Sequence, residues 1–302
     1  MNHRTTPQPI PRPRDPGPAN READALLVAL NRLGSVVVAF SGGVDSTVVL
    51  AAAVRELGTT RTLAAIADSP ALARDELALA RRTAERLGVE LAVLTTDELS
   101  VPGYRANAGD RCYFCKSTVL SRVTELAVAR AFANVATGTH RDDRRSTHRP
   151  GLRAAGELGV VEPLVEAGLG KAEVRAVARE WGLDVADKPG SPCLASRIAV
   201  GIPVTRERLE LVERAEALAR DFLTARTGVR DLRVRLLDEG FRVELDPATH
   251  ELLTERPTEA TALLHEVSRV VGTGRGGLAP YRPGAVSTTA ALSGPGGKGR
   301  TV

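Results

Sequence analysis

The stretch Val36-Val37-Val38-Ala39-Phe40-Ser41-Gly42-Gly43-Val44-Asp45-Ser46-Thr47-Val48-Val49-Leu50 decides the fold of this chain. It begins as a short apolar, β-branched run, which is typical of a buried strand. After two glycines it continues over residues 47–54 as a helix. Glycines let backbone N–H groups approach an anion, and the dipole of a helix N-terminus favours negative charge. The stretch therefore predicts a phosphate site, with Ser41, Gly42, Gly43 and Ser46 as its ligands.

Asp45 is unusual beside a phosphate, because its carboxylate repels the anion unless Mg²⁺ lies between them. We therefore expect Asp45 to hold Mg²⁺ and to take part in catalysis. The stretch is not a Walker loop, since no Gly-Lys-Ser/Thr follows a four-residue gap. Ser41–Ser46 resembles the PP-loop of the ATP pyrophosphatases. The resemblance implies cleavage of ATP between its α and β phosphates; the alternative is a tight turn with incidental hydroxyls.

The composition is that of a soluble globular protein, with 302 residues of which 43% are hydrophobic and 26% charged. Aromatic residues make up 3%, so few side chains are available for stacking on single-stranded nucleic acid. The net charge of +4 suits a small anionic substrate and does not demand a polyanion. Lysine is rare among the 41 basic residues; the lysines are Lys116, Lys171, Lys188 and Lys298.

The lack of a recognisable targeting signal and the number of cysteines together favour a cytoplasmic protein. No apolar run has transmembrane length, and the N-terminus lacks the apolar region of a signal peptide. Three cysteines are an odd number, so disulfides would leave one over. In a cytoplasmic protein such cysteines more often serve chemistry or a metal.

Strands and helices alternate over the first two thirds of the chain. Besides the opening stretch, strands are expected at 61–67, 89–94 and 134–139, and helices at 21–33, 72–87, 109–133 and 171–181. This alternation predicts a parallel, doubly wound α/β sheet, in which ligands lie at the carboxyl ends of the strands.

A smaller α+β domain is expected at the C-terminus. Its elements are a helix at 206–223, strands with one polar face at 232–236 and 241–245, a helix at 257–270 and a short segment at 276–281. We expect a disordered leader at 1–20, the PP-loop domain at 21–200, the small domain at 201–284 and a disordered tail at 285–302.

Cys112 and Cys115 form a C-x-x-C at the mouth of a helix, and Cys193 lies far along the chain in a turn-rich loop. A helix N-terminus favours the thiolate, which attacks electrophiles and binds metals. Three cysteines on a [4Fe-4S] cluster leave one iron open for sulfide or substrate. A zinc site completed by His140 or His148 is an alternative, and so is a pair of ordinary thiols.

Further motifs identify the family that the chain resembles. Arg149-Pro-Gly-Leu-Arg153, Asp187-Lys-Pro189 and Pro192-Cys-Leu-Ala-Ser-Arg197, together with Ser41–Ser46, resemble the LarE family over about residues 21–284. These are ATP-dependent sulfur transferases of lactate racemase cofactor maturation, in which a nickel-pincer nucleotide is made. The resemblance implies that ATP adenylates a carboxylate of pyridinium-3,5-biscarboxylic acid mononucleotide, which sulfur then converts to a thiocarboxylate. The resemblance also implies that AMP and pyrophosphate are released.

The family obtains sulfur in two ways. One subtype sacrifices its own cysteine, lacks the C-x-x-C, and has its donor where this chain has Pro192. The other holds a [4Fe-4S] cluster with three cysteines. The resemblance favours the second subtype, with Cys112, Cys115 and Cys193 as ligands, and leaves open whether Cys193 gives up its own sulfur.

Other site residues are carried over singly from the resemblance. Ser196 and Arg197 match the Ser-Arg pair beside the donor, and Arg233 and Arg235 match the strand that binds the substrate phosphate. The two arginines share one side of a strand, as joint anion binding requires, although a solvated face remains the alternative. The remaining candidates are less specific: Glu216 and Glu244 as acidic neighbours or surface carboxylates, Asp142 and Asp143 near the nucleotide or as helix caps, and Lys116 near a phosphate or in solvent.

Three other functions stay open. A PP-loop tRNA thiolase can also use three cysteines and an iron–sulfur cluster, but it should show a broad basic surface or an appended RNA-binding domain. An ATP-dependent amide ligase has no use for three converging cysteines. A non-catalytic metal- or nucleotide-binding protein releases no pyrophosphate. For the leading function, the resemblance implies a homo-oligomer, a small-molecule substrate, and no membrane or nucleic-acid partner.

Overall fold

The computed structural model describes residues 21–145, 150–224 and 228–282, so the expected leader at 1–20 and tail at 285–302 lie outside the described residues. The chain forms two compact units. The first contains residues 1–97 and 112–191, and the second contains 98–111 and 192–302. The second unit thus combines a short segment that precedes the C-x-x-C with the chain from Pro192 onward. The domain boundary expected between residues 200 and 201 stays a prediction.

The first unit contains a parallel four-stranded sheet in the order β3-β2-β1-β4. Its strands are β1 (Val36–Ala39), β2 (Thr62–Asp68), β3 (Leu91–Thr95) and β4 (Asn134–Ala136). The long helices are α1 (Arg21–Asn31), α2 (Val44–Leu57), α3 (Arg74–Leu87), α5 (Arg111–Ala129) and α9 (Lys171–Glu180); the short ones are α6 (Arg141–Arg144), α7 (Pro150–Glu157) and α8 (Pro163–Glu166).

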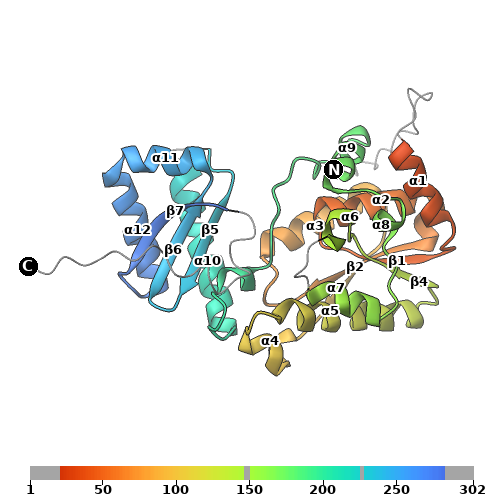
Figure 1. Ribbon diagram of the computed structural model, residues 1–302, viewed down its shortest axis with the longest axis horizontal. Coiled ribbons are helices and arrows are strands. Elements are labelled where there is room, and N and C mark those ends of the chain that lie inside the picture. The colour runs from red at the N-terminus through yellow and green to blue at the C-terminus, as the bar shows by residue number, and fades with distance from the viewer. Residues whose placement is uncertain (1–20, 146–149, 225–227, 283–302) are drawn as a thin grey trace, which may run out of the picture. The chain divides into compact units, whose positions relative to one another are not determined.

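Helices cover both faces of this sheet (Figure 1). The side chains of β1 alternate, so that Val36 and Val38 join one buried cluster and Val37 joins the other. The first cluster is completed by α1, α2, α3 and α9, and the second by Val123 and Ala127 of α5. Layers of this kind bury a parallel sheet on both sides. The predicted doubly wound α/β fold is therefore confirmed.

The second unit is built on a three-stranded sheet in the order β5-β6-β7. Strands β5 (Leu232–Leu237) and β6 (Gly240–Leu245) are antiparallel, and β7 (Gly276–Pro280) runs parallel to β6. One face carries Leu232, Val234 and Val243 into a core with α10 (Arg206–Thr224) and α12 (Pro257–Val271). The other face carries arginines and a glutamate, as the alternation in the sequence predicts.

The structure differs from the sequence-based prediction at several element ends. Helix α2 begins at Val44 rather than Thr47, because the extended Gly43 precedes it as N-cap. Helix α5 ends at Ala129 instead of near 133, because Ala131 has a φ of 54°. Helix α11 (Pro247–Glu255) was not predicted, and neither was the short α4 (Pro102–Ala106). Both have proline in their first turn, which is a helix-start signal.

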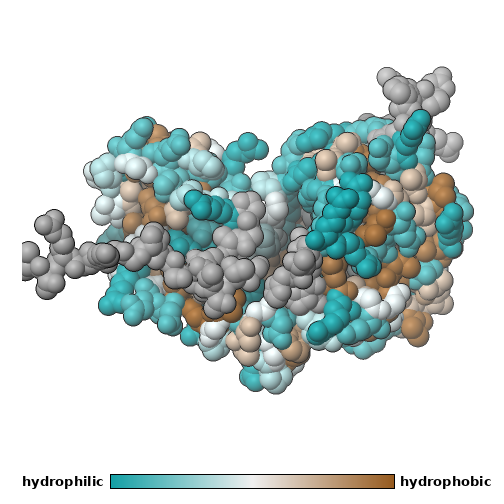
Figure 2. Space-filling view, viewed as in Figure 1, coloured by the Kyte–Doolittle hydropathy of each residue, from teal (hydrophilic) through white to brown (hydrophobic). Residues whose placement is uncertain are grey.

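The surface carries few large apolar side chains. Among the described residues, Val28 and Val128 are the exposed large hydrophobic ones. In the view of Figure 2, hydrophilic residues are interspersed with hydrophobic ones on both units. Within the described part of the chain, no helix combines the length and the apolar character that crossing a membrane requires.

Candidate active site

The loop between β1 and α2 has the shape that binds an anion. Gly42 has a φ of 68°, which a side chain would strain, and an added Cβ would lie 3.3 Å from the Cβ of Ala80. The first N–H groups of α2 point out of the helix without a partner inside it. The turn thus presents backbone donors and the positive end of a fourteen-residue helix.

Hydroxyl groups hold this loop in place. The Oγ atoms of Ser41 and Ser46 are 3.1 Å apart, and the backbone N–H of Ser41 donates to Ser46 Oγ at 3.2 Å. Thr47 Oγ1 donates to the carbonyl of Gly43 at 2.8 Å. Ser46 and Thr47 are buried, whereas Ser41 is exposed. The two serines therefore fix the loop, and Ser41 also remains accessible to a ligand.

The end of β4 passes directly over the start of α2. A Cβ on Gly138 would lie 2.6 Å from the backbone nitrogen of Ser46, so a side chain does not fit at this position. On either side of Gly138, Thr137 and Thr139 share a hydrogen bond of 3.1 Å between their hydroxyls. The carboxyl ends of β1 and β4 thus meet at one place, where ligands of doubly wound sheets bind.

Two lysines that the sequence analysis did not assign to the site flank this loop. Lys171 Nζ lies 2.6 and 2.8 Å from the two carboxylate oxygens of Asp45. Lys188 Nζ donates to the carbonyl of Gly42 at 3.3 Å and also bonds to Glu76. Both lysines stand in a chain in which arginine predominates. Their rarity is the signal that would have found them, because an ammonium is a compact point charge that guanidinium does not replace.

Asp142 and Asp143 serve as helix caps in the structure. Asp143 Oδ2 accepts the backbone N–H of His140 at 3.2 Å at the start of α6. Asp142 Oδ2 accepts the backbone N–H of Lys171 at 2.7 Å at the start of α9. That hydrogen bond lowers the pKa of Asp142; burial acts in the opposite direction, and nearby positive charges lower the pKa further. Capping was one of the two interpretations left open by the sequence.

Cys112 and Cys115 lie in the first and second turns of α5. Residues three apart on a helix share one face, so both thiols can serve one metal. Cys112 is exposed, and its carbonyl lies 3.4 Å from where a Cβ on Gly151 of α7 would be. Gly151 therefore lets α7 approach the C-x-x-C helix closely. Arg149, which begins the same motif, and His148 lie outside the described residues.

Cys193 is exposed and belongs to the second unit, whereas Cys112 and Cys115 belong to the first. The three cysteines form no disulfide. Among the residues that the structure describes, no group of three or more His, Cys, Asp or Glu side chains makes a metal site. The three-cysteine cluster therefore stays a prediction.

The second unit gathers arginines on the polar face of its sheet. Arg197 makes a two-point contact with Glu216, with N–O distances of 2.8 and 3.1 Å. Arg235 Nη1 donates to the carbonyl of Ser196 at 2.9 Å, and its Nε lies 2.7 Å from Glu244. Arg233 lies 4.0 Å from Asp231 and faces the ring of Tyr281. With Arg242 beside Glu244, four arginines face three carboxylates.

Burial changes the electrostatics of these arginines. Arg197, Arg233 and Arg235 are each less than 10% exposed. Burial lowers the pKa of Arg233, and the charge of Arg197 lowers it further, while Glu216 acts in the opposite direction. Burial also lowers the pKa of Arg235, partly offset by Glu244. Guanidinium nevertheless stays charged in proteins. The excess positive charge of the cluster would therefore be relieved by an incoming anion.

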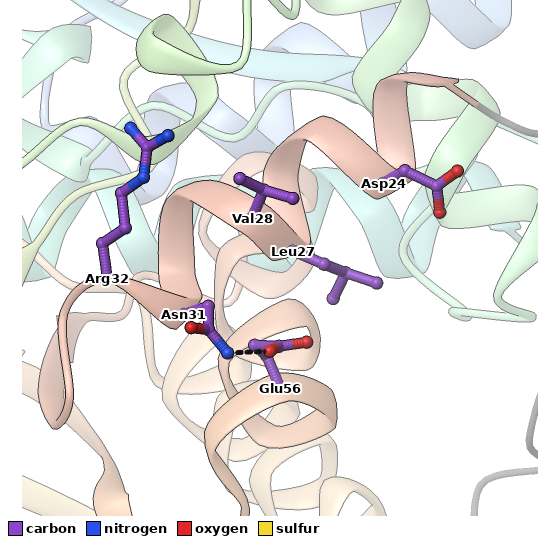
Figure 3. A pocket seen from close by; sticks show the side chains of 6 residues that line it. All are labelled: Asp24, Leu27, Val28, Asn31, Arg32 and Glu56. Carbon is purple, nitrogen blue, oxygen red and sulfur yellow. Dashed lines mark hydrogen bonds between the residues drawn. The ribbon is translucent and has the colours of Figure 1, made fainter.

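The groove in Figure 3 is not this site. It is lined by Asp24, Leu27, Val28, Asn31 and Arg32 of the α1 region and by Glu56 of α2. Asn31 bonds to Glu56, which lies in the last turn of α2, whereas the anion-binding loop precedes the first turn. The groove and the loop thus lie at opposite ends of α2.

Known proteins resemble this chain over most of its length. A family model described as asparagine synthase matches residues 24–103, which include the anion-binding loop. The pyridinium-3,5-bisthiocarboxylic acid mononucleotide synthase of Lactiplantibacillus plantarum is 35% identical over 223 residues, or 74% of this chain and 79% of that protein. This chain belongs to the LarE family. The resemblance inferred from its motifs is thereby confirmed.

Other relatives of this chain carry no assigned activity in their names. An uncharacterized protein of Synechocystis sp. is 40% identical over 215 residues, covering 71% of this chain and 78% of that protein. An uncharacterized protein of Methanocaldococcus jannaschii is 27% identical over 198 residues, covering 66% and 74%. The common region therefore extends well beyond the anion-binding loop.

Proposed function

We propose that this LarE-family chain is an ATP-dependent sulfur transferase that adenylates a carboxylate of pyridinium-3,5-biscarboxylic acid mononucleotide and converts it to a thiocarboxylate. The product would serve nickel-pincer nucleotide biosynthesis. The observation that carries the proposal is the PP-loop, a helix N-terminus with Asp45 in its first turn, in a chain 35% identical to a named synthase of that product class. The enzyme is expected to act in the cytoplasm as a homo-oligomer.

The residues of the first unit suit the adenylation step. A carboxylate becomes a good electrophile only when its oxygen is turned into a leaving group. Here the carboxylate oxygen attacks the α-phosphorus of ATP, the bond to the β-phosphate oxygen breaks, and pyrophosphate leaves. The loop amides bind the phosphates, and Asp45 supplies a carboxylate, which is the type of ligand that Mg²⁺ prefers. Bound Mg²⁺ would offset the charge of the leaving pyrophosphate.

The arginine face of the second unit suits the substrate. A mononucleotide carries a phosphate, and guanidinium groups bind phosphate through paired N–H donors. Arg233 and Arg235 project from one face of β5, and Ser196 and Arg197 come from the adjoining turn after Cys193. Arg197 and Arg235 are already engaged by Glu216 and Glu244. We therefore assign Arg233, together with Arg235 on the same face of the strand, to the substrate phosphate.

The same proposal places a [4Fe-4S] cluster on Cys112, Cys115 and Cys193. Its support is the pairing of two thiols on one helix face, and the exposure of Cys112 and Cys193. Arg111, which precedes Cys112, donates to the carbonyl of Ala195, two residues after Cys193, at 2.8 Å. Both of these residues belong to the second unit. The cluster, when bound, would supply an open iron that carries sulfide.

Pyrophosphate release tests the function. Purified protein with ATP, Mg²⁺ and the pyridinium mononucleotide should release pyrophosphate and AMP, and mass spectrometry should find a thiocarboxylate product. Release stimulated by tRNA instead would support the thiolase. An amide product formed equally well after replacing all three cysteines would support the ligase. No release with any of these substrates would overturn an enzymatic function.

Iron analysis tests the sulfur source. Protein purified without oxygen should contain about four iron and matching acid-labile sulfide per chain, and Cys193→Ala should lose them. Zinc in place of iron would contradict the cluster. Conversion of Cys193 to dehydroalanine after one turnover would show that this residue gives up its own sulfur. Light scattering of the same sample measures the oligomeric state.

A further inference from the structure

The ammonium of Lys171 occupies the carboxylate that the proposed function assigns to Mg²⁺. Its Nζ lies within hydrogen-bond distance of both oxygens of Asp45, at 2.8 and 2.6 Å. The ammonium of Lys171 and Mg²⁺ would therefore compete for the carboxylate of Asp45. Because Asp45 lies in the first turn of α2, both cations would be beside any phosphate bound at the loop.

The backbone at Lys171 is fixed independently of its side chain. The N–H of Lys171 donates to Asp142 Oδ2 at 2.7 Å, and the N–H of Gly170 donates to Glu173 Oε2 at 3.0 Å. A Cβ on Gly170 would lie 2.6 Å from Asp142 Oδ2, so the chain is tightly packed there. Helix α9 thus begins at a rigid point from which a flexible four-carbon stem reaches the loop.

The ion pair itself is easily exchanged. The side chains of Lys171 and Asp45 are 39% and 25% exposed, and an ion pair that solvent reaches contributes little stability. A divalent cation attracts the same carboxylate with twice the charge. The ammonium has three donors, and a neighbouring phosphate offers them strong acceptors. Losing Asp45 to Mg²⁺ therefore leaves Lys171 free to contact the phosphates.

Lys188, which contacts the same loop at Gly42, shows the contrasting case. Its side chain is 16% exposed, and its ammonium bonds to Glu76 and to the carbonyl of Gly42. The carbonyls of Ala186 and Lys188 in turn accept from Arg175 at 2.6 and 3.0 Å. Lys188 is therefore held by the fold, whereas Lys171 is held by the one carboxylate that a cation would take.

We propose that Lys171 is a phosphate-binding residue that is stored on Asp45 in the nucleotide-free protein. Binding of ATP with Mg²⁺ transfers Asp45 to the metal and Lys171 to the β- and γ-phosphates, which become the pyrophosphate leaving group. The inference rests on the proposed function for its nucleotide. It adds Lys171 to the nucleotide site, together with an exchange of the ammonium for Mg²⁺ on Asp45. Neither the sequence motifs nor the family assignment specify these two features.

Nucleotide binding provides the first test. Calorimetry with α,β-methylene-ATP and saturating Mg²⁺ compares the wild type, Lys171→Met, and the control Arg179→Met, which removes an exposed charge from the same helix. Lys171→Met keeps the stem and the backbone N–H, and it should weaken binding about tenfold. Binding of AMP, which lacks the pyrophosphate, should not change. Unchanged affinity for the analogue, or equal losses for both nucleotides, would overturn the assignment.

Metal binding without nucleotide provides the second test. Electron paramagnetic resonance measures Mn²⁺ alone, in place of Mg²⁺. Lys171→Met should bind Mn²⁺ several-fold more tightly than the wild type and than Arg179→Met, because the competing ammonium is gone. Adding Asp45→Asn should remove that gain. Equal Mn²⁺ affinity in all the proteins would contradict the exchange. If the methionine variant does not fold, Lys171→Gln replaces it, because it also removes the charge and should tighten Mn²⁺ binding in the same way.

Neither test requires sulfur transfer or the pyridinium substrate. If pyrophosphate is never released but Lys171→Met weakens the analogue and tightens Mn²⁺, the inference stands and the proposed reaction fails. If the reaction proceeds while both affinities stay unchanged, the reaction stands and the inference fails. The two ideas are therefore separable in one set of proteins.

Discussion

The two units build anion sites in opposite ways. The first unit uses backbone N–H groups at the start of α2, and its charged neighbours Asp45 and Lys171 are open to solvent. The second unit uses buried side chains, with Arg197, Arg233 and Arg235 crowded on one sheet face. A backbone site has fixed geometry and needs only small residues around it. A side-chain site of buried charges needs partners to hold it. We infer that substitutions in the first site affect chemistry, and those in the second affect stability as well.

The largest expected effect is on catalysis in the first unit. Asp45→Asn removes the carboxylate for Mg²⁺ and should lower the rate of pyrophosphate release about a thousandfold or more, because the charge of the leaving group is no longer offset. Asp75→Asn is the matched control, since Asp75 is an exposed carboxylate in the first turn of α3. It should leave the rate unchanged. A shared loss of thermal stability, rather than a selective loss of rate, would contradict the comparison.

The next effect concerns stability in the second unit. Glu216 accepts from Arg197 and from the backbone N–H of Val234, and both side chains of the ion pair are nearly buried. Glu216→Gln should lower the free energy of unfolding by about 3 kcal/mol, because it leaves a buried guanidinium without its charge partner. Urea unfolding followed by circular dichroism measures this change.

A geometrically similar pair provides the control for that experiment. Arg130 and Glu90 also make a two-point contact, at 3.1 and 2.9 Å, but both are about half exposed. The contact lowers the pKa of Glu90 through its hydrogen bond to Arg130. Glu90→Gln should nevertheless leave the unfolding curve unchanged, since solvent screens exposed pairs. Equal losses in Glu216→Gln and Glu90→Gln would show that burial does not distinguish the two units.

The same difference explains what could be read from the sequence. The first site follows from local rules, because one strand, two glycines and one helix carry all of Ser41–Ser46. The arginine face was also predictable, since alternation along β5 places Arg233 and Arg235 on one side. The ion pairs of Asp45 with Lys171 and of Lys188 with Glu76 join segments far apart in the chain. Such pairs leave no periodic pattern in the sequence. The rarity of lysine, and for Lys188 the Asp187-Lys-Pro189 motif, marked the two residues but not their partners.

Glu216 and Glu244 illustrate the same limit in the second unit. Each was an acidic residue that a surface position would have explained equally well. The fold places Glu216 of α10 beside Arg197 and Glu244 of β6 opposite Arg233. Their pairing depends on how the helix packs on the sheet and on the register of the hairpin. No local sequence motif specifies the helix packing or the hairpin register, so the sequence left both interpretations of these glutamates open.

A smaller effect is expected on substrate affinity. Arg233→Met keeps the stem that lies beside Tyr281 but removes the charge assigned to the substrate phosphate. The KM for the mononucleotide should rise about tenfold with little change in kcat. Arg269→Met, at an exposed position of α12, is the control and should change neither constant. A fall in kcat at unchanged KM would place Arg233 at the reacting carboxylate instead of the phosphate.

The smallest effect is a pH-dependent one at the cap of α11. Burial acts to raise the pKa of Asp246, but hydrogen bonds from Thr249 and from the backbone of Arg230 and Asp231 outweigh it, so the pKa is lowered. A lowered pKa stabilises the fold above the unfolded value of about 3.9, and this stabilisation is lost as the pH falls through the folded value.

Asp246→Asn should therefore cost about 1 kcal/mol at neutral pH, and the difference from wild type should shrink below about pH 4. Urea unfolding at a series of pH values measures it. Asp238→Asn, in the exposed turn between β5 and β6, should show no such dependence. A difference that stayed constant down to low pH would mean that Asp246 acts through its shape alone. In that case, the charged side chains of the second unit would affect its stability only on the face that carries the buried arginines. The difference in stability between the two units would then be confined to that face.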